Sequence, residues 1–275
     1  MAPLLEVQDV SFKYPGALIL DKIRFSMSSG EVFCLLGPNG CGKTTLLDCI
    51  LGWLKPCGGR VLLNGSSLEN MSAQQIARHL AYVPQIHQKT FPYLVQDIVL
   101  MGRASFLGAF KTPSQEDLAI AEQALDKVGI ARLKDRPYTQ LSGGEGQLVM
   151  VARALAQNSP LIVMDEPTAH LDYRHELIIL ETVVELVRQT GLSVLMATHI
   201  PNHCYYFENQ GIKTQAALVK NHRIMALGRP SEVLSEGNLG ELYSIRTRII
   251  NCGLDDGGQL KQVVPLSTLN SFEQS

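Results

Sequence analysis

Hydrophobic positions follow two spacings along this chain. Apolar and polar residues alternate over Leu5–Phe12 and Ile19–Met27, as they do in half-buried strands. Short, largely apolar runs indicate further strands at Val32–Leu36, Arg60–Leu63, Leu80–Val83, Leu161–Met164, Ser193–Ala197 and, as a pair, within Ala216–Leu227. Helical spacing covers Lys43–Leu54, Val95–Met101, Ser114–Val128, Ala131–Leu133, Glu145–Gln157 and Glu176–Gln189. A last hairpin is predicted from Ile245–Cys252 and Gln259–Val264, with its turn at Asp255–Gly258.

The order of these elements predicts the fold class. Buried strands alternate with helices, which indicates an α/β fold with a largely parallel sheet. The alternating strands near the start add an antiparallel β region. Residues 92–144 show helical spacing with little strand signal, which indicates an inserted α-helical subdomain. We therefore expect a core from 1–91 and 145–230, a helical subdomain at 92–144 and a short C-terminal extension at 231–275.

Composition narrows the function classes. The net charge of -2 gives no broad attraction to nucleic acid or anionic lipid, so no nucleic-acid partner is expected. No run of about 18 apolar residues could span a bilayer, so a membrane role would need spanning helices from another chain. The six cysteines form no Cys-x-x-Cys pair, and we expect them to be reduced thiols.

The strongest chemical signal is a glycine-rich loop that follows the apolar run Val32–Leu36. Its sequence fits G-x-x-x-x-G-K-[ST] and comprises Gly37, Pro38, Asn39, Gly40, Cys41, Gly42, Lys43 and Thr44, followed by Thr45. Such a loop turns backbone N–H groups and a helix N-terminus toward phosphates. Lys43 would reach the β- and γ-phosphates, and Thr44 would offer its hydroxyl to Mg²⁺. The loop predicts ATP binding and makes the expected core a P-loop NTPase core. A bulky adduct on Cys41 should block nucleotide entry.

Two carboxylates follow the buried run Leu161–Met164. Ligands collect at the carboxyl ends of parallel strands, so Asp165 is expected to approach the phosphate loop and to bind Mg²⁺, through water. Pro167 marks the exit of the strand, which would let Glu166 turn toward the γ-phosphate and polarise the attacking water. Taken alone, Asp-Glu-Pro is more often a turn at a strand end than a catalytic pair, but beside a phosphate loop the catalytic interpretation is favoured.

A second motif carries a family resemblance. The segment Leu141–Gln147, with Ser142, Gly143 and Gly144, resembles the signature sequence of ATP-binding cassette (ABC) ATPases. Tyr14 resembles the aromatic residue that stacks on adenine, and Gln85 resembles the Q-loop glutamine. Asp172 lies in a segment similar to the D-loop, and His199 resembles the switch histidine. The resemblance implies that Gln85, Glu166 and His199 act in hydrolysis, and that Gln85 joins Thr44 and Asp165 at Mg²⁺.

The resemblance also implies partners. Two copies would form a head-to-tail dimer, with each ATP between the phosphate loop of one copy and Ser142–Gln147 of the other, and with Asp172 near the nucleotide. Closing and reopening of this dimer would drive a membrane permease. Ser142 and Glu145 also form a capping box, so Ser142 could cap its helix, contact phosphate, or do both. The family often has Arg where this chain has Gly146, which puts the turnover rate in doubt.

Three features resemble the ATPases of type II importers for iron–siderophore complexes, haem, cobalamin or molybdate. They are the segment Asp97–Arg103, the single signature, and the tail ending Gln262–Leu266. Such an ATPase would work at the cytoplasmic face of the inner membrane, as a peripheral subunit on a polytopic permease served by a substrate-binding protein. Residues around Phe106–Phe110 are expected to contact that permease. A non-transport ABC ATPase in a soluble assembly complex is the alternative, and an exporter is a further one.

Overall fold

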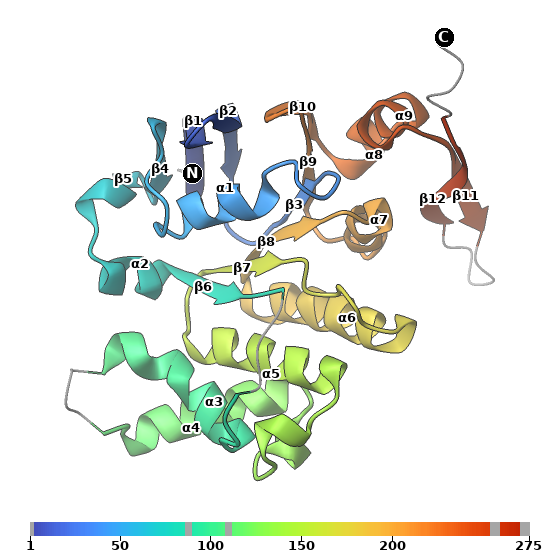
Figure 1. Cartoon of the computed structure of the whole chain (residues 1–275). Helices are drawn as coiled ribbons and strands as arrows, with labels where there is room; N and C mark the ends of the chain where they lie inside the picture. Colours follow the sequence, from blue (N-terminus) through green and yellow to red (C-terminus); the bar gives the residue numbers. More distant parts are fainter. Residues whose placement is uncertain (1–2, 86–89, 108–111, 254–258, 270–275) are drawn as a thin grey trace. The chain divides into compact units, whose positions relative to one another are not determined.

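The computed structural model describes residues 3–85, 90–107, 112–253 and 259–269 (Figure 1). These residues form two compact units, each described here by itself. Unit 1 comprises 1–65 and 196–275, and unit 2 comprises 66–195. The division falls inside one strand, β8 (Ser193–Thr198), whose first three residues belong to unit 2 and whose last three belong to unit 1.

Unit 1 contains an antiparallel sheet and part of a largely parallel one. Its remaining elements are β1 (Leu5–Tyr14), β2 (Ala17–Met27), β3 (Val32–Leu36), α1 (Lys43–Ile50), β4 (Gly58–Leu63), α7 (Pro201–Asn209), β9 (Thr214–Lys220), β10 (Arg223–Gly228), α8 (Pro230–Val233), α9 (Glu236–Tyr243), β11 (Ile245–Gly253) and β12 (Gln259–Thr268). β1 pairs antiparallel with β2 and with β4, while β3 runs parallel to β9. All five residues of β3 are buried, which explains its continuous apolar sequence.

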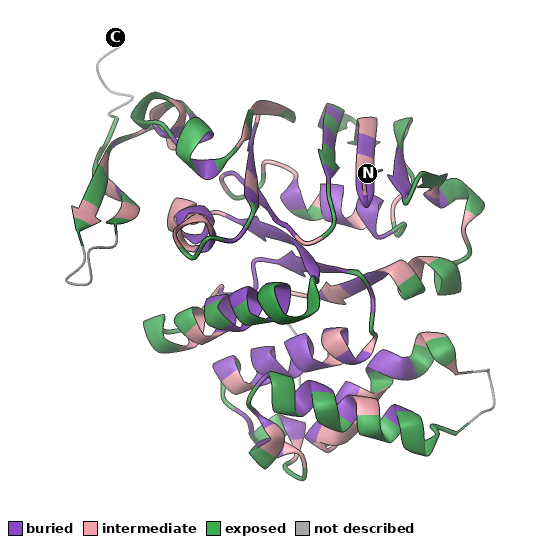
Figure 2. Cartoon of the chain, turned by 180° about the vertical axis from the view of Figure 1, so that it is seen from behind, coloured by how far each residue is buried: buried purple, intermediate pink, exposed green. Residues whose placement is uncertain are grey.

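Unit 2 consists mostly of helices around two parallel strands. Its elements are β5 (Ser66–Ser67), α2 (Ala73–His79), β6 (Leu80–Val83), α3 (Val95–Leu100), α4 (Gln115–Lys127), α5 (Gly143–Ala156), β7 (Leu161–Asp165) and α6 (Tyr173–Thr190), with short 3₁₀ turns that include Met101–Phe106. β6 pairs parallel with β7 from Leu80–Leu161 to Val83–Met164. The helix α6 buries one side and exposes the other, as its spacing of apolar residues requires (Figure 2).

The segment Asp97–Arg103 has a structural explanation inside unit 2. A Cβ on Gly102 would lie 2.2 Å from the carbonyl O of Arg153, so only glycine allows this approach to α5. Arg103 is buried, and its Nε donates to Asp117 Oδ1 at 2.9 Å while its Nη1 donates to the carbonyl O of Ala156 at 3.1 Å. The segment therefore fixes α3 against α4 and α5. Of the residues expected to meet a permease, Phe106 lies under the Arg103 guanidinium at 4.1 Å, and 108–111 lie outside the described residues.

The predicted elements agree with the structure in type and differ at some ends. The predicted strands at Val32–Leu36 and Leu80–Val83 match β3 and β6, and the C-terminal hairpin is β11 with β12; its predicted turn lies outside the described residues. The helix predicted over Lys43–Leu54 was too long. It ends at Ile50, because Gly52 has a φ of 75° and the N–H groups of Trp53 and Leu54 both donate to the carbonyl O of Asp48.

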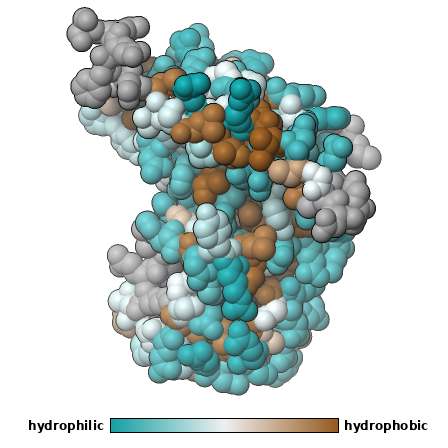
Figure 3. Space-filling view, turned by 90° about the vertical axis from the view of Figure 1, so that its right-hand side faces the viewer, coloured by the Kyte–Doolittle hydropathy of each residue, from teal (hydrophilic) through white to brown (hydrophobic). Residues whose placement is uncertain are grey.

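Some large hydrophobic side chains remain exposed. In unit 1 they include Leu227, Ile250 and Leu266, the last two on the C-terminal hairpin. Figure 3 shows a group of hydrophobic residues (brown) on the surface in the upper half of the view, surrounded by hydrophilic ones. In the described part of the chain, every helix is too short or too polar to cross a membrane.

Candidate nucleotide-binding and hydrolysis site

The phosphate loop connects β3 to α1 in unit 1. Gly42 is the N-cap residue of α1 and has a φ of 102°, a conformation that side chains with a Cβ rarely adopt. A Cβ at this position would also lie 3.0 Å from the carbonyl O of Ile19. The chain therefore passes from a buried strand into a helix through a turn that only glycine permits. This is the strand–loop–helix context that the sequence predicted for a phosphate-binding loop.

Lys43 begins α1 and is buried, with 5% of its surface exposed. Its Nζ donates to the carbonyl O of Gly37 at 2.7 Å and of Pro38 at 3.2 Å. The ammonium is therefore held across the loop by the loop's own carbonyls. Thr44, one residue further on, is exposed, and Cys41 is partly exposed.

His199 follows the end of β8, as predicted. The backbone N–H of Gly37 donates to the carbonyl O of Thr198 at 3.4 Å, which joins the start of the phosphate loop to the residue before His199. The carbonyl O of His199 accepts a hydrogen bond from the hydroxyl of Tyr243 at 2.9 Å. No sequence pattern pointed to Tyr243, because the two residues are 44 positions apart in the chain.

Tyr14 ends β1 with 45% of its surface exposed. Its ring contacts Phe12 edge to face, with the ring centroids 5.0 Å apart. A face of the Tyr14 ring can therefore be accessible to a base, and stacking on adenine stays a prediction.

In unit 2, the signature segment begins α5 with the predicted capping box. The backbone N–H of Glu145 donates to Ser142 Oγ at 3.2 Å, and the backbone N–H of Ser142 donates to Glu145 Oε2 at 3.0 Å. This second hydrogen bond is the main reason why the pKa of Glu145 is below its usual value. The cap reading of Ser142 is confirmed, and contact with phosphate stays a prediction.

Gly144 connects the signature to the segment around Asp172. A Cβ on Gly144 would lie 2.1 Å from His175 Cδ2, so only glycine fits here. Asp172 Oδ1 accepts from the backbone N–H of His175 at 2.9 Å and lies 2.8 Å from His175 Nδ1. These contacts lower the pKa of Asp172, with the backbone hydrogen bond as the largest cause. Sequence reasoning missed His175, although its position three residues after the helix cap Asp172 was a usable signal.

Asp165 and Glu166 lie at the end of β7, and both are buried. The strand ends at Asp165, and Glu166 has a φ of 44°. This left-handed conformation costs about 1–2 kcal/mol in a residue that has a Cβ. It turns the chain out of the strand one residue before Pro167, as the sequence predicted. The approach of Glu166 to the γ-phosphate stays a prediction.

Gln85 follows β6 and is partly exposed. Gln147 on α5 donates from Nε2 to the carbonyl O of Pro84 at 3.2 Å, so the signature helix holds the residue before Gln85. Gly146 stands where the signature that the sequence resembles often has Arg, and its carbonyl O accepts from the hydroxyl of Tyr138 at 3.3 Å.

Comparison with known proteins identifies the family of this chain. The model of the ABC transporter family matches residues 20–169. An uncharacterised ABC transporter ATP-binding protein of Haemophilus influenzae is 38% identical over 92% of this chain and 94% of the relative. The iron(3+)-hydroxamate import ATP-binding protein FhuC of Bacillus subtilis is 32% identical over 90% of each chain. The chain belongs to the ABC transporter family.

A solved structure agrees with this assignment over nearly the whole chain. It is an inward-facing ABC transporter provisionally classed as metal-chelate type, with a TM-score of 0.84 and 30% identity, and the match covers 96% of this chain and 98% of the other. As an ABC transporter ATPase, the chain binds and hydrolyses ATP. The α/β fold with its P-loop core and antiparallel N-terminal sheet is confirmed.

The ABC family match covers the phosphate loop, the signature, Asp165 and Glu166, whereas Tyr14, Asp172 and His199 lie outside it. The structure brings the loop and His199 together in unit 1. In unit 2 the signature helix contacts Pro84, the residue before Gln85, and it packs against His175, which Asp172 holds. The approach of Thr44 in unit 1 to Asp165 and Gln85 in unit 2 stays a prediction. Hydroxyl, amide and carboxylate oxygens are the hard ligands that suit Mg²⁺, so these three residues fit that metal by their chemistry.

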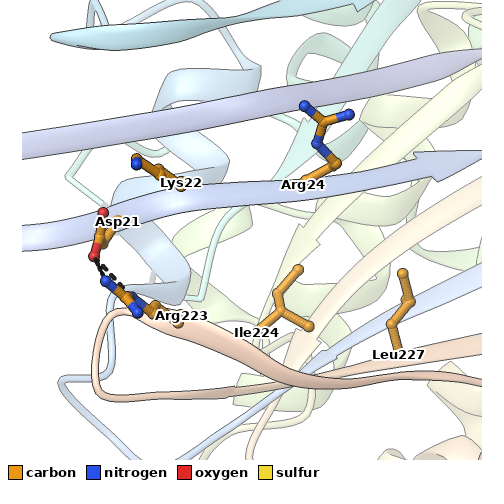
Figure 4. Close-up of a pocket in the computed structure, with 6 residues that line it drawn as sticks. All are labelled: Asp21, Lys22, Arg24, Arg223, Ile224 and Leu227. Carbon is orange, nitrogen blue, oxygen red and sulfur yellow. Dashed lines mark hydrogen bonds and ion pairs between the residues drawn. The ribbon is translucent and has the colours of Figure 1, made fainter.

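This ABC ATPase also has a basic pocket of about 430 Å³ between β2 and β10 in unit 1, lined by Asp21, Lys22, Arg24, Arg223, Ile224 and Leu227 (Figure 4). Arg223 Nε donates to Asp21 at 2.7 Å, and Arg24 Nε donates to Asp9 at 2.9 Å. Because each arginine is paired with a carboxylate, the pocket does not concentrate enough positive charge to indicate a second phosphate site.

Proposed function

We propose that this ABC ATPase energises an importer as a head-to-tail homodimer on a membrane permease. The observation that supports the proposal is that two glycine-containing helix starts lie in this chain. One is the loop Gly37–Thr45 with Lys43 in unit 1, and the other is the capped start of α5 at Ser142 in unit 2. Free N–H groups at a helix start bind anions. Two such starts in one chain suit a γ-phosphate that is shared between two copies.

At the first start, Lys43 exchanges its partners. Its ammonium leaves the carbonyls of Gly37 and Pro38 and contacts the β- and γ-phosphates, so ATP replaces the hydrogen bonds that now hold the side chain. The backbone N–H groups of Asn39, Gly40 and Gly42 surround the phosphates, and Thr45 supports the start of α1. Tyr14 stacks on the adenine.

The residues that act in hydrolysis follow the ends of strands. Glu166, turned out of β7 by its left-handed backbone, orients and polarises the attacking water. His199 contacts the γ-phosphate, and Gln85 positions the water and the metal. Thr44, Asp165 and Gln85 would hold Mg²⁺, which when bound neutralises charge on the phosphate oxygens.

The second copy completes each site. Ser142, Gly143 and Gly144 of that copy approach the γ-phosphate, with Asp172 beside them. In the open state Ser142 caps α5, and in the closed dimer it shares its hydroxyl with phosphate. ATP holds the dimer closed, and hydrolysis with product release reopens it.

The partner is a polytopic permease at the cytoplasmic face of the inner membrane, and a substrate-binding protein delivers cargo to it. The cargo class is a metal chelate, namely iron–siderophore, haem or cobalamin, or an oxyanion such as molybdate. The similarity to FhuC and to the solved metal-chelate type transporter supports the iron-chelate members of this group. A soluble assembly complex remains the alternative.

Complementation and purification test the proposal together. Cells that lack the chain receive the wild type, Lys43→Ala or Glu166→Gln, and uptake of iron chelate, haem, cobalamin and molybdate is measured. We expect the wild type to restore uptake of one cargo and both variants to fail. The tagged chain should co-purify with a polytopic membrane protein. Purification with soluble proteins only, without any restored uptake, would favour the assembly complex.

A further inference from the structure

The C-terminal extension reaches the backbone at His199. Tyr243 is the last residue of α9, and its hydroxyl donates to the carbonyl O of His199 at 2.9 Å. Both residues belong to unit 1. The carbonyl belongs to the peptide that leads from β8 into α7, so the hydrogen bond acts on the junction that sets the direction of the His199 side chain.

The residues on either side of His199 are held by the core of unit 1. The hydroxyl of Thr198 accepts from the backbone N–H of Ile200 at 3.1 Å and lies 2.8 Å from His203 Nδ1. The carbonyl O of Thr198 accepts from Gly37 at 3.4 Å. Between these neighbours, the hydroxyl of Tyr243 holds the peptide carbonyl of His199 itself.

The element that carries Tyr243 is firmly packed. Leu239 and Leu242 of α9 are buried, and Ser235 caps the helix by accepting from the backbone N–H of Asn238 at 3.1 Å. The hairpin that follows is attached to α7 beside it (Figure 1). Asn202 exchanges two hydrogen bonds with the backbone of Val263, at 2.8 and 3.2 Å, and Asn209 exchanges two with Lys261, at 3.1 and 3.2 Å. The extension and the helix after His199 are therefore held together.

We propose that Tyr243 is a positioning residue for ATP hydrolysis: its hydroxyl fixes the peptide of His199 and thereby the approach of the imidazole to the γ-phosphate. This rests on the role proposed above for His199. Lys43 is held by the carbonyls of Gly37 and Pro38, whereas Tyr243 holds the carbonyl of His199, so loss of the Tyr243 hydroxyl should slow turnover without weakening ATP binding. Loss of a catalytic group's positioning is expressed in kcat when ground-state binding is unchanged.

Tyr243→Phe removes only the hydroxyl, and Tyr205→Phe is its matched control. Tyr205, on α7, donates from its hydroxyl to the carbonyl O of Leu234 at 3.1 Å, so it makes the same type of hydrogen bond away from His199. Steady-state ATPase and thermal unfolding are measured for both. We expect Tyr243→Phe to lower kcat by about three- to tenfold, the size of one ordinary hydrogen bond, with little change in KM for ATP. Tyr205→Phe should lower the melting temperature at least as much and leave kcat near the wild-type value. Equal kcat for the two variants would overturn the proposal.

His199→Ala separates this inference from the proposed function, because it removes the imidazole and keeps the carbonyl that Tyr243 contacts. We expect it to slow single-turnover hydrolysis about 10²-fold or more, and Tyr243→Phe to add no further loss in that background. A wild-type rate for His199→Ala would contradict the role of His199. A slow His199→Ala on which Tyr243→Phe still acts at full strength would contradict the positioning role alone.

Discussion

Gly144 and His175 lie so close together that a Cβ on Gly144 would stand 2.1 Å from His175 Cδ2 and 2.8 Å from His175 Cβ. Because the Cβ of His175 is involved, rotation of the ring cannot relieve the contact. The ring is also held by Asp172. The start of the signature helix and the start of α6 are therefore packed as one piece within unit 2, and the glycine has a structural reason beside its expected approach to phosphate.

Gly144→Ala should therefore destabilise the protein. Overpacking costs about 1–3 kcal/mol, from which the higher helix propensity of alanine recovers about 0.5–1 kcal/mol. Gly143→Ala is the matched control, since a Cβ there meets only Leu171 Cδ2 at 3.9 Å. Chemical denaturation should show a loss for Gly144→Ala and none for Gly143→Ala. Gly144→Ala/His175→Ala should recover only part of that loss, because alanine removes the ring but keeps the Cβ that would lie 2.8 Å away. Equal stability of the two alanine variants would mean that the His175 contact is absent.

Ser142→Ala should lower the ATPase rate by more than its small loss in free energy of unfolding would explain. Loss of the cap alone costs about 1 kcal/mol, whereas loss of a phosphate contact acts on turnover. Ser72→Ala offers a matched cap: Ser72 forms the same type of box with Gln75 at the start of α2, and nothing assigns it to the nucleotide. If both variants lose similar stability and both keep the wild-type ATPase rate, Ser142 is a cap only.

A maleimide on Cys41 should abolish ATP binding, because the partly exposed thiol lies inside the phosphate loop. ATP present during labelling should protect the protein. Cys41→Ser is the control, since it keeps the small polar side chain and leaves the exposed Cys57 and the partly exposed Cys252 available. Nucleotide binding measured by fluorescence should survive labelling of Cys41→Ser. Its loss in that variant would place the sensitive thiol elsewhere.

Asp117 should make stability depend on pH in the acid range. Hydrogen bonds from Ser114 first, and then from Arg103, lower the pKa of Asp117 from 3.8 to about 2. A carboxyl with a lowered folded-state pKa contributes stability that is complete above its unfolded value and declines as pH falls toward the folded value. Asp117→Asn should therefore be less stable than the wild type near neutral pH, and the difference should shrink as pH falls from about 4 toward about 2. A difference that stays constant over this range in denaturant titrations would contradict the lowered pKa of Asp117 and its hydrogen bonds from Ser114 and Arg103.

The parts of the site that sequence predicted share one property: the local chain alone defines them. Gly42 and Lys43 follow a buried strand, and Ser142 and Glu145 sit three residues apart, so spacing was sufficient. Glu166 was predicted to turn because Pro167 follows it.

Helix α2 was not predicted from the sequence. None of its seven residues is buried, so its sequence carries no stripe of apolar residues at helical spacing.

The contacts that sequence missed join residues distant in the chain. Tyr243 donates to His199, and Gln147 donates to Pro84. Asn202 and Asn209 of α7 form hydrogen bonds with the backbone of β12. Only folding brings these partners together. The Asp97–Arg103 segment was recognised through family resemblance, and its packing against Arg153 and Asp117 explains physically why Gly102 and Arg103 are needed.

The central claim, a nucleotide site completed by a second copy of the chain, is tested most directly with Glu166→Gln. Loss of the group that polarises water should slow hydrolysis about 10²-fold or more while ATP binding remains. Light scattering during gel filtration with ATP and Mg²⁺ should then give twice the monomer mass, with two ATP per dimer. Adding Lys43→Ala to the same variant should return the monomer. A Glu166→Gln protein that stays monomeric with ATP and hydrolyses it at the wild-type rate would contradict the account.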